Sequence, residues 1–260
     1  MRGASSVRVE GRWPGAIQLR RGWSHAHARP WNVANQHTAH LRVLRGGVRF
    51  LDDCRGVLGD LGATEVLSPP LPVSARRSWV EAGFEEHASL DLLRLDLERV
   101  ASPDHLVAPG DLDLLTEALR IDAAAFDPFW RFDRTAMLEA MQSTPNSALH
   151  VVRGEHGGLA GFAITGLGTA IAYLQRVAVH PDHQGRGLGR SLIRTAAWWA
   201  RRNGAKALML NTQSENAGAR RLYEAEGFVL LPEPLSVLRA ETRPATPAPA
   251  PFVYDEEQAV

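Results

Sequence analysis

The sequence has very little cysteine and lysine and no long hydrophobic run. Its single cysteine, Cys54, excludes an internal disulfide framework and fits a reducing cytoplasm. No apolar run is long enough to span a membrane, and no apolar segment of the signal-peptide type follows the N-terminus, so we expect neither a membrane partner nor a secretion signal. The only lysine, Lys206, does not stand in a Gly-Lys-Ser/Thr sequence, which excludes a P-loop.

Net charge is also lacking, although charge is uneven along the chain. The 29 basic and 29 acidic residues balance, which argues against a polyanion such as bulk nucleic acid as the main partner. The first 50 residues, however, hold nine arginines and one acid, Glu10. A solvated, partly disordered arm explains this excess, and a nucleic-acid or membrane contact is the alternative. His25 and His27 lie in the same region without a cysteine or acid at ligand spacing, so we expect no metal site.

What the chain does contain is a glycine-rich segment between a strand-like and a helix-like run. Gln184-Gly185-Arg186-Gly187-Leu188-Gly189 follows an apolar run from Ala170 to Val179 and precedes helical periodicity from Leu188 to Asn203. Glycines let the backbone approach an anion, and the free N–H groups at a helix start point at it, so this order is typical of a phosphate site. The glycine spacing does not fit the dinucleotide pattern G-x-G-x-x-G. A plain turn between strand and helix is the alternative.

With its flanking residues, this segment resembles the acetyl-CoA loop of the GNAT acetyltransferase superfamily, Q/R-x-x-G-x-G/A, in which Gln184, Gly187 and Gly189 fill the pattern. In that family the strand before the loop is splayed from its neighbour, and its free backbone groups bind the pantetheine amides. The N–H groups of the loop hold the pyrophosphate, and two arginines of this chain are available for charge. The resemblance therefore implies a cofactor-binding set of Val177, Ala178, Val179, Gln184, Gly185, Arg186, Gly187, Leu188, Gly189 and Arg190.

A second segment that resembles the family lies downstream, from Leu210 to Ala217 and on to Leu222-Tyr223-Glu224. It is similar to a motif in which an asparagine at a helix start contacts the cofactor and a tyrosine faces its sulfur. Asn216 and Tyr223 are two helical turns apart and therefore share a helix face. The resemblance implies that Asn216 binds the cofactor and that Tyr223 is catalytic, giving a proton to the departing CoA thiolate. A capping asparagine and a core tyrosine are the alternatives.

The general base has no single candidate in the sequence. Many members of the family carry a glutamate on the cofactor strand, about where this chain has Gln175, and a glutamine cannot take a proton from the amine. Asp127, Asp133, Glu139 or a water chain could serve instead, or the amine could arrive already neutral. The base therefore stays unassigned.

The chain also contains an internal repeat. Gly62–Leu67 matches Gly204–Met209 at an offset of 142, and Ala75–Phe84 matches Ala219–Phe228 at an offset of 144. Each copy is expected to contain a helix, a strand, a helix, a Gly-Phe pair and a strand. Two such blocks in the same order indicate a repeated supersecondary unit.

The first copy lacks the residues that carry the chemistry. Pro72 and Trp79 stand where the second copy has its asparagine and tyrosine, and only Gly46-Gly47 precedes the helix of the first copy. The sequence therefore predicts a single cofactor site. It also suggests a tandem arrangement, in which an inactive half-domain docks on an active one.

Taken together, the pattern predicts a mixed α/β (α+β) fold of the GNAT type, with a mixed central sheet flanked by helices and preceded by a degenerate partial repeat. We expect a partial GNAT-like domain over residues 1–100, of which 1–12 are flexible, and a catalytic domain over residues 103–240. Residues 241–260 are rich in proline and alanine and are expected to form a disordered tail.

The function implied by the resemblance is acetyl-CoA-dependent N-acetyl transfer, directly from CoA to a primary amine on a small molecule or a peptide, with no metal. A non-catalytic acyl-CoA-binding regulatory module is the alternative, and a nucleic-acid-associated protein with an arginine-rich N-terminus is a third. A homodimer is left open. The acceptor cannot be chosen, because acceptor choice lies in variable segments, here Phe126–Phe132 and the half-domain.

Overall fold

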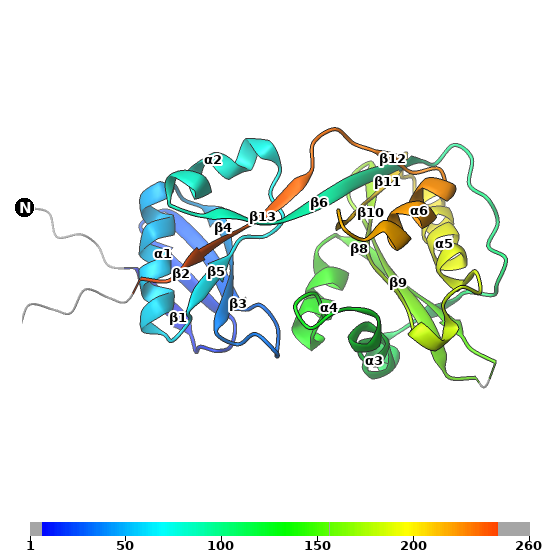
Figure 1. Cartoon of the computed structure of the whole chain (residues 1–260), viewed down its shortest axis with the longest axis horizontal. Coiled ribbons are helices and arrows are strands. Elements are labelled where there is room, and N and C mark those ends of the chain that lie inside the picture. The colour runs from blue at the N-terminus through cyan, green and yellow to red at the C-terminus, as the bar shows by residue number, and fades with distance from the viewer. Residues whose placement is uncertain (1–6, 156, 244–260) are drawn as a thin grey trace, which may run out of the picture.

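The computed structural model describes residues 7–155 and 157–243 and contains two similar units side by side (Figure 1). The first unit consists of β1 (Arg8–Gly11), β2 (Ile17–Arg21), β3 (Ser24–Pro30), β4 (Thr38–Arg45), α1 (Val48–Asp60), β5 (Glu65–Leu67), α2 (Val73–Glu81) and β6 (Glu85–Asp96). The second consists of β7 (Ala108–Gly110), the 3-10 helix η1 (Leu112–Leu114), α3 (Leu115–Ala125), α4 (Arg134–Gln142), β8 (Asn146–Arg153), β9 (Leu159–Leu167), β10 (Ile171–Val179), the 3-10 helix η2 (Pro181–His183), α5 (Leu188–Arg202), β11 (Ala207–Gln213), α6 (Ala217–Ala225), β12 (Val229–Leu230) and β13 (Leu235–Glu241).

The ends of the chain differ in part from the expected flexible segments. Residues 8–11, which we expected in a flexible arm, form β1 and pair with β2 in antiparallel register. The expected tail starts at Glu241, which is the last residue of β13, and residues 244–260 lie outside the described part of the chain.

The repeat predicted from the sequence is confirmed. Helix α1, strand β5 and helix α2 of the first unit correspond to α5, β11 and α6 of the second. Gly83 and Gly227 follow the second helix of each copy with φ of +81° and +88°. Such a left-handed residue ends a helix best when it is glycine. The phenylalanine after each glycine, Phe84 or Phe228, is buried and fixes the chain to the core.

The two units exchange their last strands. Strand β6 leaves the first unit and pairs with β11 of the second in antiparallel register, from Asp96–Ala207 to Leu90–Gln213. Strand β13 leaves the second unit and pairs with β5 of the first, from Glu241–Glu65 to Arg239–Leu67. The two crossing strands also pair with each other, and Figure 1 shows them running across the middle of the molecule. Each unit therefore completes the sheet of the other.

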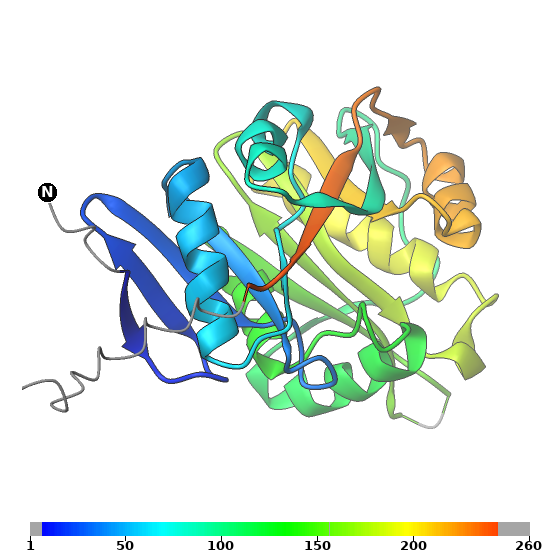
Figure 2. The ribbon, with the colours of Figure 1, turned by 60° about the vertical axis from the view of Figure 1, so that its left-hand side comes forward.

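The exchange produces a single sheet in the order β1-β2-β3-β4-β5-β13-β6-β11-β10-β9-β8-β7, with β12 paired to β6 beside that path. Figure 2 shows this sheet from a second direction, and β13 lies in it between β5 and β6. The expected domain boundary, between residues 100 and 103, falls in the segment after β6. Strands β6 and β13 each pair with a strand from the other side of that boundary, so the two units share one sheet.

Helices cover the sheet of the second unit on both faces. On one face α5 and α6 pack on a core that includes Leu192, Ala196 and Tyr223. On the other face α3 and α4 pack on residues such as Phe162 and Ile164. In the first unit, α1 packs on strand residues that alternate along β2, β3 and β4. No helix in the described part of the chain is long and apolar enough to cross a membrane.

Candidate active site

The strands that precede and follow α5 separate over most of their length. β10 and β11 are parallel neighbours over three residue pairs only, from Ile171–Ala207 to Tyr173–Met209. Beyond that point β10 pairs with β9, and β11 continues along β6. A β-bulge between Leu174 and Arg176 marks the place where they part, and bulges of this kind bend a strand away from its neighbour. The facing edges of β10 and β11 are thus open to an added extended chain.

The first unit contains the same opening. β4 and β5 are parallel over three residue pairs, from Thr38–Glu65 to His40–Leu67. The separation of the strands therefore does not by itself show which unit binds a ligand. The difference between the units lies in the segment that follows the first strand of each pair. After β4 the chain passes through Gly46 and Gly47, and Gly47 caps α1 in an extended conformation with φ of −126°.

After β10 the chain forms a loop that only glycine can follow. Gly185 and Gly187 have φ of +75° and +82°, and Gly187 is the N-cap of α5. This left-handed conformation costs an L residue about 1–3 kcal/mol. It lets the loop turn sharply into α5, so the unpaired N–H groups at the start of that helix face outward beside the open edge of β10. These are the groups that an anion binds.

The loop is fixed from two sides. Gln184 donates from Nε2 to the carbonyl of Val179, at 3.0 Å. His105, in the linker between the units, donates from Nε2 to the carbonyl of Arg186, at 2.8 Å. The linker is itself anchored, because the amides of Asp104 and His105 donate to the buried Ser191 hydroxyl on α5. The contact from His105 was not predicted from the sequence.

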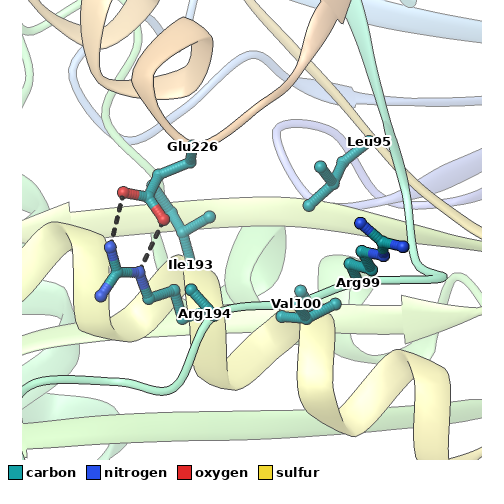
Figure 3. A pocket seen from close by; sticks show the side chains of 8 residues that line it. Leu95, Arg99, Val100, Ile193, Arg194 and Glu226 are labelled. Atoms are coloured by element: carbon teal, nitrogen blue, oxygen red, sulfur yellow. Dashed lines mark hydrogen bonds and ion pairs between the residues drawn. The ribbon is translucent and has the colours of Figure 1, made fainter.

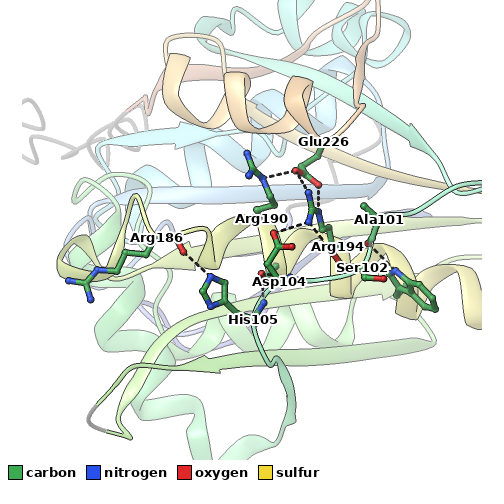
Figure 4. Close-up of polar contacts among 10 residues, drawn as sticks. Ala101, Ser102, Asp104, His105, Arg186, Arg190, Arg194 and Glu226 are labelled. Carbon is green, nitrogen blue, oxygen red and sulfur yellow. Dashed lines mark hydrogen bonds and ion pairs between the residues drawn. The ribbon is translucent and has the colours of Figure 1, made fainter.

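The two arginines that were expected to supply charge both have acidic neighbours. Arg190 Nε lies 2.8 Å from Oε1 of Glu226, a carboxylate that is almost fully buried (Figure 4). Arg186 is half exposed at the loop tip and lies 3.6 Å from Glu155. Arg194 also binds Glu226, through Nε at 2.7 Å, and reaches Asp104 at 2.9 Å. This network ties α5 to α6 and to the linker, and it leaves Arg186 as the more available cation.

A small cavity lies beside this network and does not have the size of a ligand site. It is lined by residues of β6, the linker, α5 and α6, including Leu95, Val100 and Ile193 (Figure 3). Its volume is about 40 Å³, which suits one or a few water molecules. Glu226 at its wall is already paired with Arg194.

The two residues expected on α6 lie on that helix as predicted. Asn216 is its N-cap, and its Oδ1 accepts the amide of Ala219 at 3.0 Å. Tyr223 is buried, 6% exposed, and packs against α5. Among the described residues, none makes a hydrogen bond to the Tyr223 hydroxyl or to Asn216 Nδ2. Burial raises the pKa of Tyr223 to about 12, and the nearby charge of Arg176 offsets part of that rise. The hydroxyl therefore keeps its proton at neutral pH.

The residues considered for the general base have other partners. Gln175, at the bulge, donates from Nε2 to the hydroxyl of Ser143 at the end of α4. Asp127 accepts the amide of Phe129 in a turn, and Asp133 caps α4. Glu139 forms a bidentate ion pair with an arginine of β3. Each carboxylate of this set has a partner, although Asp127 and Asp133 use only one oxygen in these contacts, and the base stays unassigned.

A buried cluster next to the tyrosine was not predicted. Arg176 of β10 forms a bidentate pair with Asp122 of α3, with N–O distances of 2.6 and 2.9 Å. Asp122 is fully buried. The guanidinium carbon lies 3.5 Å from the ring centroid of Phe126 and 3.9 Å from that of Phe132. One charged residue in an otherwise apolar strand, opposite an acid on an apolar helix, was the available signal.

Comparisons with known proteins agree with this geometry. Residues 115–228 match the model of the family described as Acetyltransferase (GNAT) family. The [Ribosomal protein bS18]-alanine N-acetyltransferase of Escherichia coli strain K12 is 39% identical over 74 residues, which are 28% of this chain and 50% of that protein. The streptothricin acetyltransferase of Streptomyces lavendulae is 39% identical over 91 residues, which are 32% of this chain and 45% of that protein. The chain thus spans about half the length of these relatives.

Solved structures extend the likeness to the whole chain at the level of the fold. A tandem GNAT protein from the clavulanic acid biosynthesis pathway superposes with a TM-score of 0.65 at 14% identity, over 92% of this chain and 85% of that one. A GCN5-related N-acetyltransferase from Sphaerobacter thermophilus gives a TM-score of 0.56 at 17% identity, over 89% and 82%. The predicted mixed α/β fold of the GNAT type, preceded by a partial GNAT-like repeat, is confirmed.

Proposed function

We propose, on the premise that residues 115–228 form a domain of the GNAT family, that this protein moves an acetyl group from acetyl-CoA to a primary amine. The observation that carries the proposal is the combination of an open β10 edge and a left-handed glycine loop at the start of α5. The first unit has the opening without the loop. The proposal therefore places one acetyl-CoA site in the chain, in the second unit.

The proposed site assigns a part of acetyl-CoA to each segment. The pantetheine arm would add to β10 along Val177, Ala178 and Val179, as an extra strand does. The pyrophosphate would lie on the backbone N–H groups from Gln184 to Arg190, with the side chain of Arg186 free to add charge. Asn216 would contact the same molecule through the amide nitrogen that has no partner among the described residues.

Tyr223 is proposed as the general acid. When the amine nitrogen bonds to the acetyl carbon, the bond from that carbon to sulfur breaks, and the sulfur leaves as a thiolate unless it gains a proton. A buried tyrosine with a pKa of about 12 is protonated at the time of reaction and can supply that proton. The amine gives up its own proton to a base that stays unassigned, because none of the residues considered above is singled out for that role.

A non-catalytic acyl-CoA-binding module is the second candidate, and Gln175 is the observation that favours it. Its amide is held by Ser143 and offers no base on the cofactor strand. The two functions share the cofactor site and differ only in turnover. An assay with many amines therefore separates them.

We expect the full chain to release CoA from acetyl-CoA in the presence of a suitable amine. The panel would include a peptide with N-terminal alanine and streptothricin, the acceptors named for the two relatives, together with lysine, polyamines and aminoglycosides. A thiol reagent can report the CoA, because the only thiol of the chain, Cys54, is buried and burial raises its pKa to about 12. Saturable acetyl-CoA binding with no amine-dependent release across the panel would instead support the binding module.

A further inference from the structure

The connection between α3 and α4, residues Phe126–Phe132, has few backbone partners of its own. Helix α3 ends at Ala125 and α4 begins at Arg134, so the carbonyls between them are not used in either helix. Backbone carbonyls that are removed from water need other donors. We call this segment the α3–α4 loop, and the first unit supplies the donors for three of its carbonyls, while the other donors come from the second unit itself.

Asn32, in the connection between β3 and β4, supplies most of the donors from the first unit. Its Nδ2 lies 2.9, 3.1 and 3.2 Å from the carbonyl oxygens of Pro128, Phe129 and Arg131. Its Oδ1 accepts the backbone and side-chain amides of Asn35. The side chain is thus oriented at both ends, and the residue is only 3% exposed. An amide is the side chain that can donate at one end and accept at the other.

Two neighbours of Asn32 extend the contact. Trp31 donates from Nε1 to the carbonyl of Phe129, and its ring stacks on that of Phe129 with centroids 5.0 Å apart. Arg29 donates to both carboxylate oxygens of Glu139 on α4, at 2.8 to 3.0 Å. Three side chains within a stretch of four residues of the first unit, Arg29, Trp31 and Asn32, therefore hold the α3–α4 loop and the helix after it.

The same loop contacts the cluster beside the proposed acid. The carbonyl of Trp130 accepts NH2 of Arg176 at 2.8 Å, and the amide of Phe132 donates to Asp122 at 2.7 Å. The rings at both ends of the loop cover the guanidinium of Arg176. Arg176 in turn lowers the pKa of Tyr223 by its charge. A continuous series of contacts thus leads from Asn32 through the α3–α4 loop to Arg176 on β10.

We propose that the first unit positions the amine-acceptor side of the active site, and that Asn32 is the positioning residue. Asn32 fixes three carbonyls of the α3–α4 loop, and the loop fixes Arg176 and the space on the α3 and α4 side of the opened strands. The inference rests on the proposed function, since an acceptor must approach from a side that the pantetheine arm and the glycine loop do not occupy. A small displacement of a loop that orients a substrate has a large effect on the rate.

The test uses the full chain and two independent readouts. Asn32→Ala removes the donors, and Gln36→Ala, an exposed residue in the same connection, is the matched control. We expect Asn32→Ala to speed amide hydrogen exchange in the α3–α4 loop about tenfold or more and to raise the KM of the amine by a similar factor. The KM of acetyl-CoA should not change, because the glycine loop has separate anchors. Gln36→Ala should behave as the wild type.

A second variant keeps the proposal testable if Asn32→Ala folds poorly. Trp31→Phe keeps a ring beside Phe129 but removes the N–H donor and the second ring of the indole, so it should show the same pattern with a smaller amplitude. Unchanged amide hydrogen exchange of the α3–α4 loop in both variants would contradict the proposal that Asn32 and Trp31 hold this loop. Faster exchange with an unchanged KM for the amine would overturn the positioning role. If the wild type acetylates no amine, both the proposed function and the positioning role of Asn32 are contradicted. The exchange measurement then still shows whether Asn32 and Trp31 hold the α3–α4 loop.

Discussion

Replacing Tyr223 with phenylalanine is expected to lower kcat for acetyl transfer by about 10²- to 10⁴-fold, the usual contribution of a positioned general acid. Acetyl-CoA affinity should stay close to that of the wild type. The ring packs on α5 and its hydroxyl makes no hydrogen bond to a described residue, so phenylalanine keeps the packing and removes only the proton. The measurement is steady-state kinetics together with acetyl-CoA titration on the same preparations.

The pH dependence adds a second readout to this prediction. Burial holds the pKa of Tyr223 at about 12, so the acid stays protonated and the wild-type rate should not fall between neutral pH and pH 10 through loss of this proton. The rate should instead rise as the amine loses its own proton. Tyr173→Phe is the matched control, because Tyr173 is the other tyrosine of the second unit and is 40% exposed. A Tyr223→Phe enzyme as active as the wild type would remove the tyrosine from the mechanism.

Deleting residues 1–102 is expected to leave a chain that does not fold as a soluble monomer and has no transferase activity. The deletion removes β6, and β11 would then keep only its three residue pairs with β10. It also removes β5, so β13 would lose both of its partners. Unpaired strand edges of this kind tend to pair with other chains. Sedimentation and circular dichroism of residues 103–260 would test this.

The size of the effect follows from what β6 buries. Leu90 and Leu93 of β6, and Leu97 directly after it, are each at most 3% exposed, and a buried leucine contributes about 1.5–3 kcal/mol. Three of them contribute roughly 5–9 kcal/mol, which is comparable with the whole stability of a typical domain, about 5–15 kcal/mol. The truncated chain therefore has little stability left.

A split chain provides the matched control for the deletion. Residues 1–102 and 103–260 produced together contain every strand, and β6 and β13 give each fragment a surface that only the other completes. We expect the two fragments to copurify and to regain activity. If residues 103–260 alone were as stable and active as the full chain, the first unit would be dispensable. The shared sheet would then be required neither for folding nor for activity.

The sequence was most informative where local rules decide the structure. Helix ends at Gly83 and Gly227, alternating strands and the repeat offset were all predictable, because turn conformation and burial pattern depend on neighbouring residues. The capping position of Asn216 and its shared face with Tyr223 follow from helical spacing. The family resemblance then located the glycine loop.

The contacts that were missed are all long-range. Nothing local in Asn32 or Trp31 indicates that they bind a loop about 100 positions later. The strand exchange was missed for the same reason, since either copy could in principle close its own sheet. Glu226 was also overlooked, because its role depends on α6 lying against Arg190 and Arg194 of α5.

We propose that this chain has one acetyl-CoA site and that the glycine loop forms it. Calorimetric titration of the full chain with acetyl-CoA tests it most directly, alongside Gly187→Val and Gly22→Val. Both glycines have positive φ, but Gly22 lies in the turn between β2 and β3, away from the loop. We predict one molecule bound per chain in the wild type and in Gly22→Val, and no binding in Gly187→Val. Two molecules per chain, none, or undiminished binding by Gly187→Val would contradict the account.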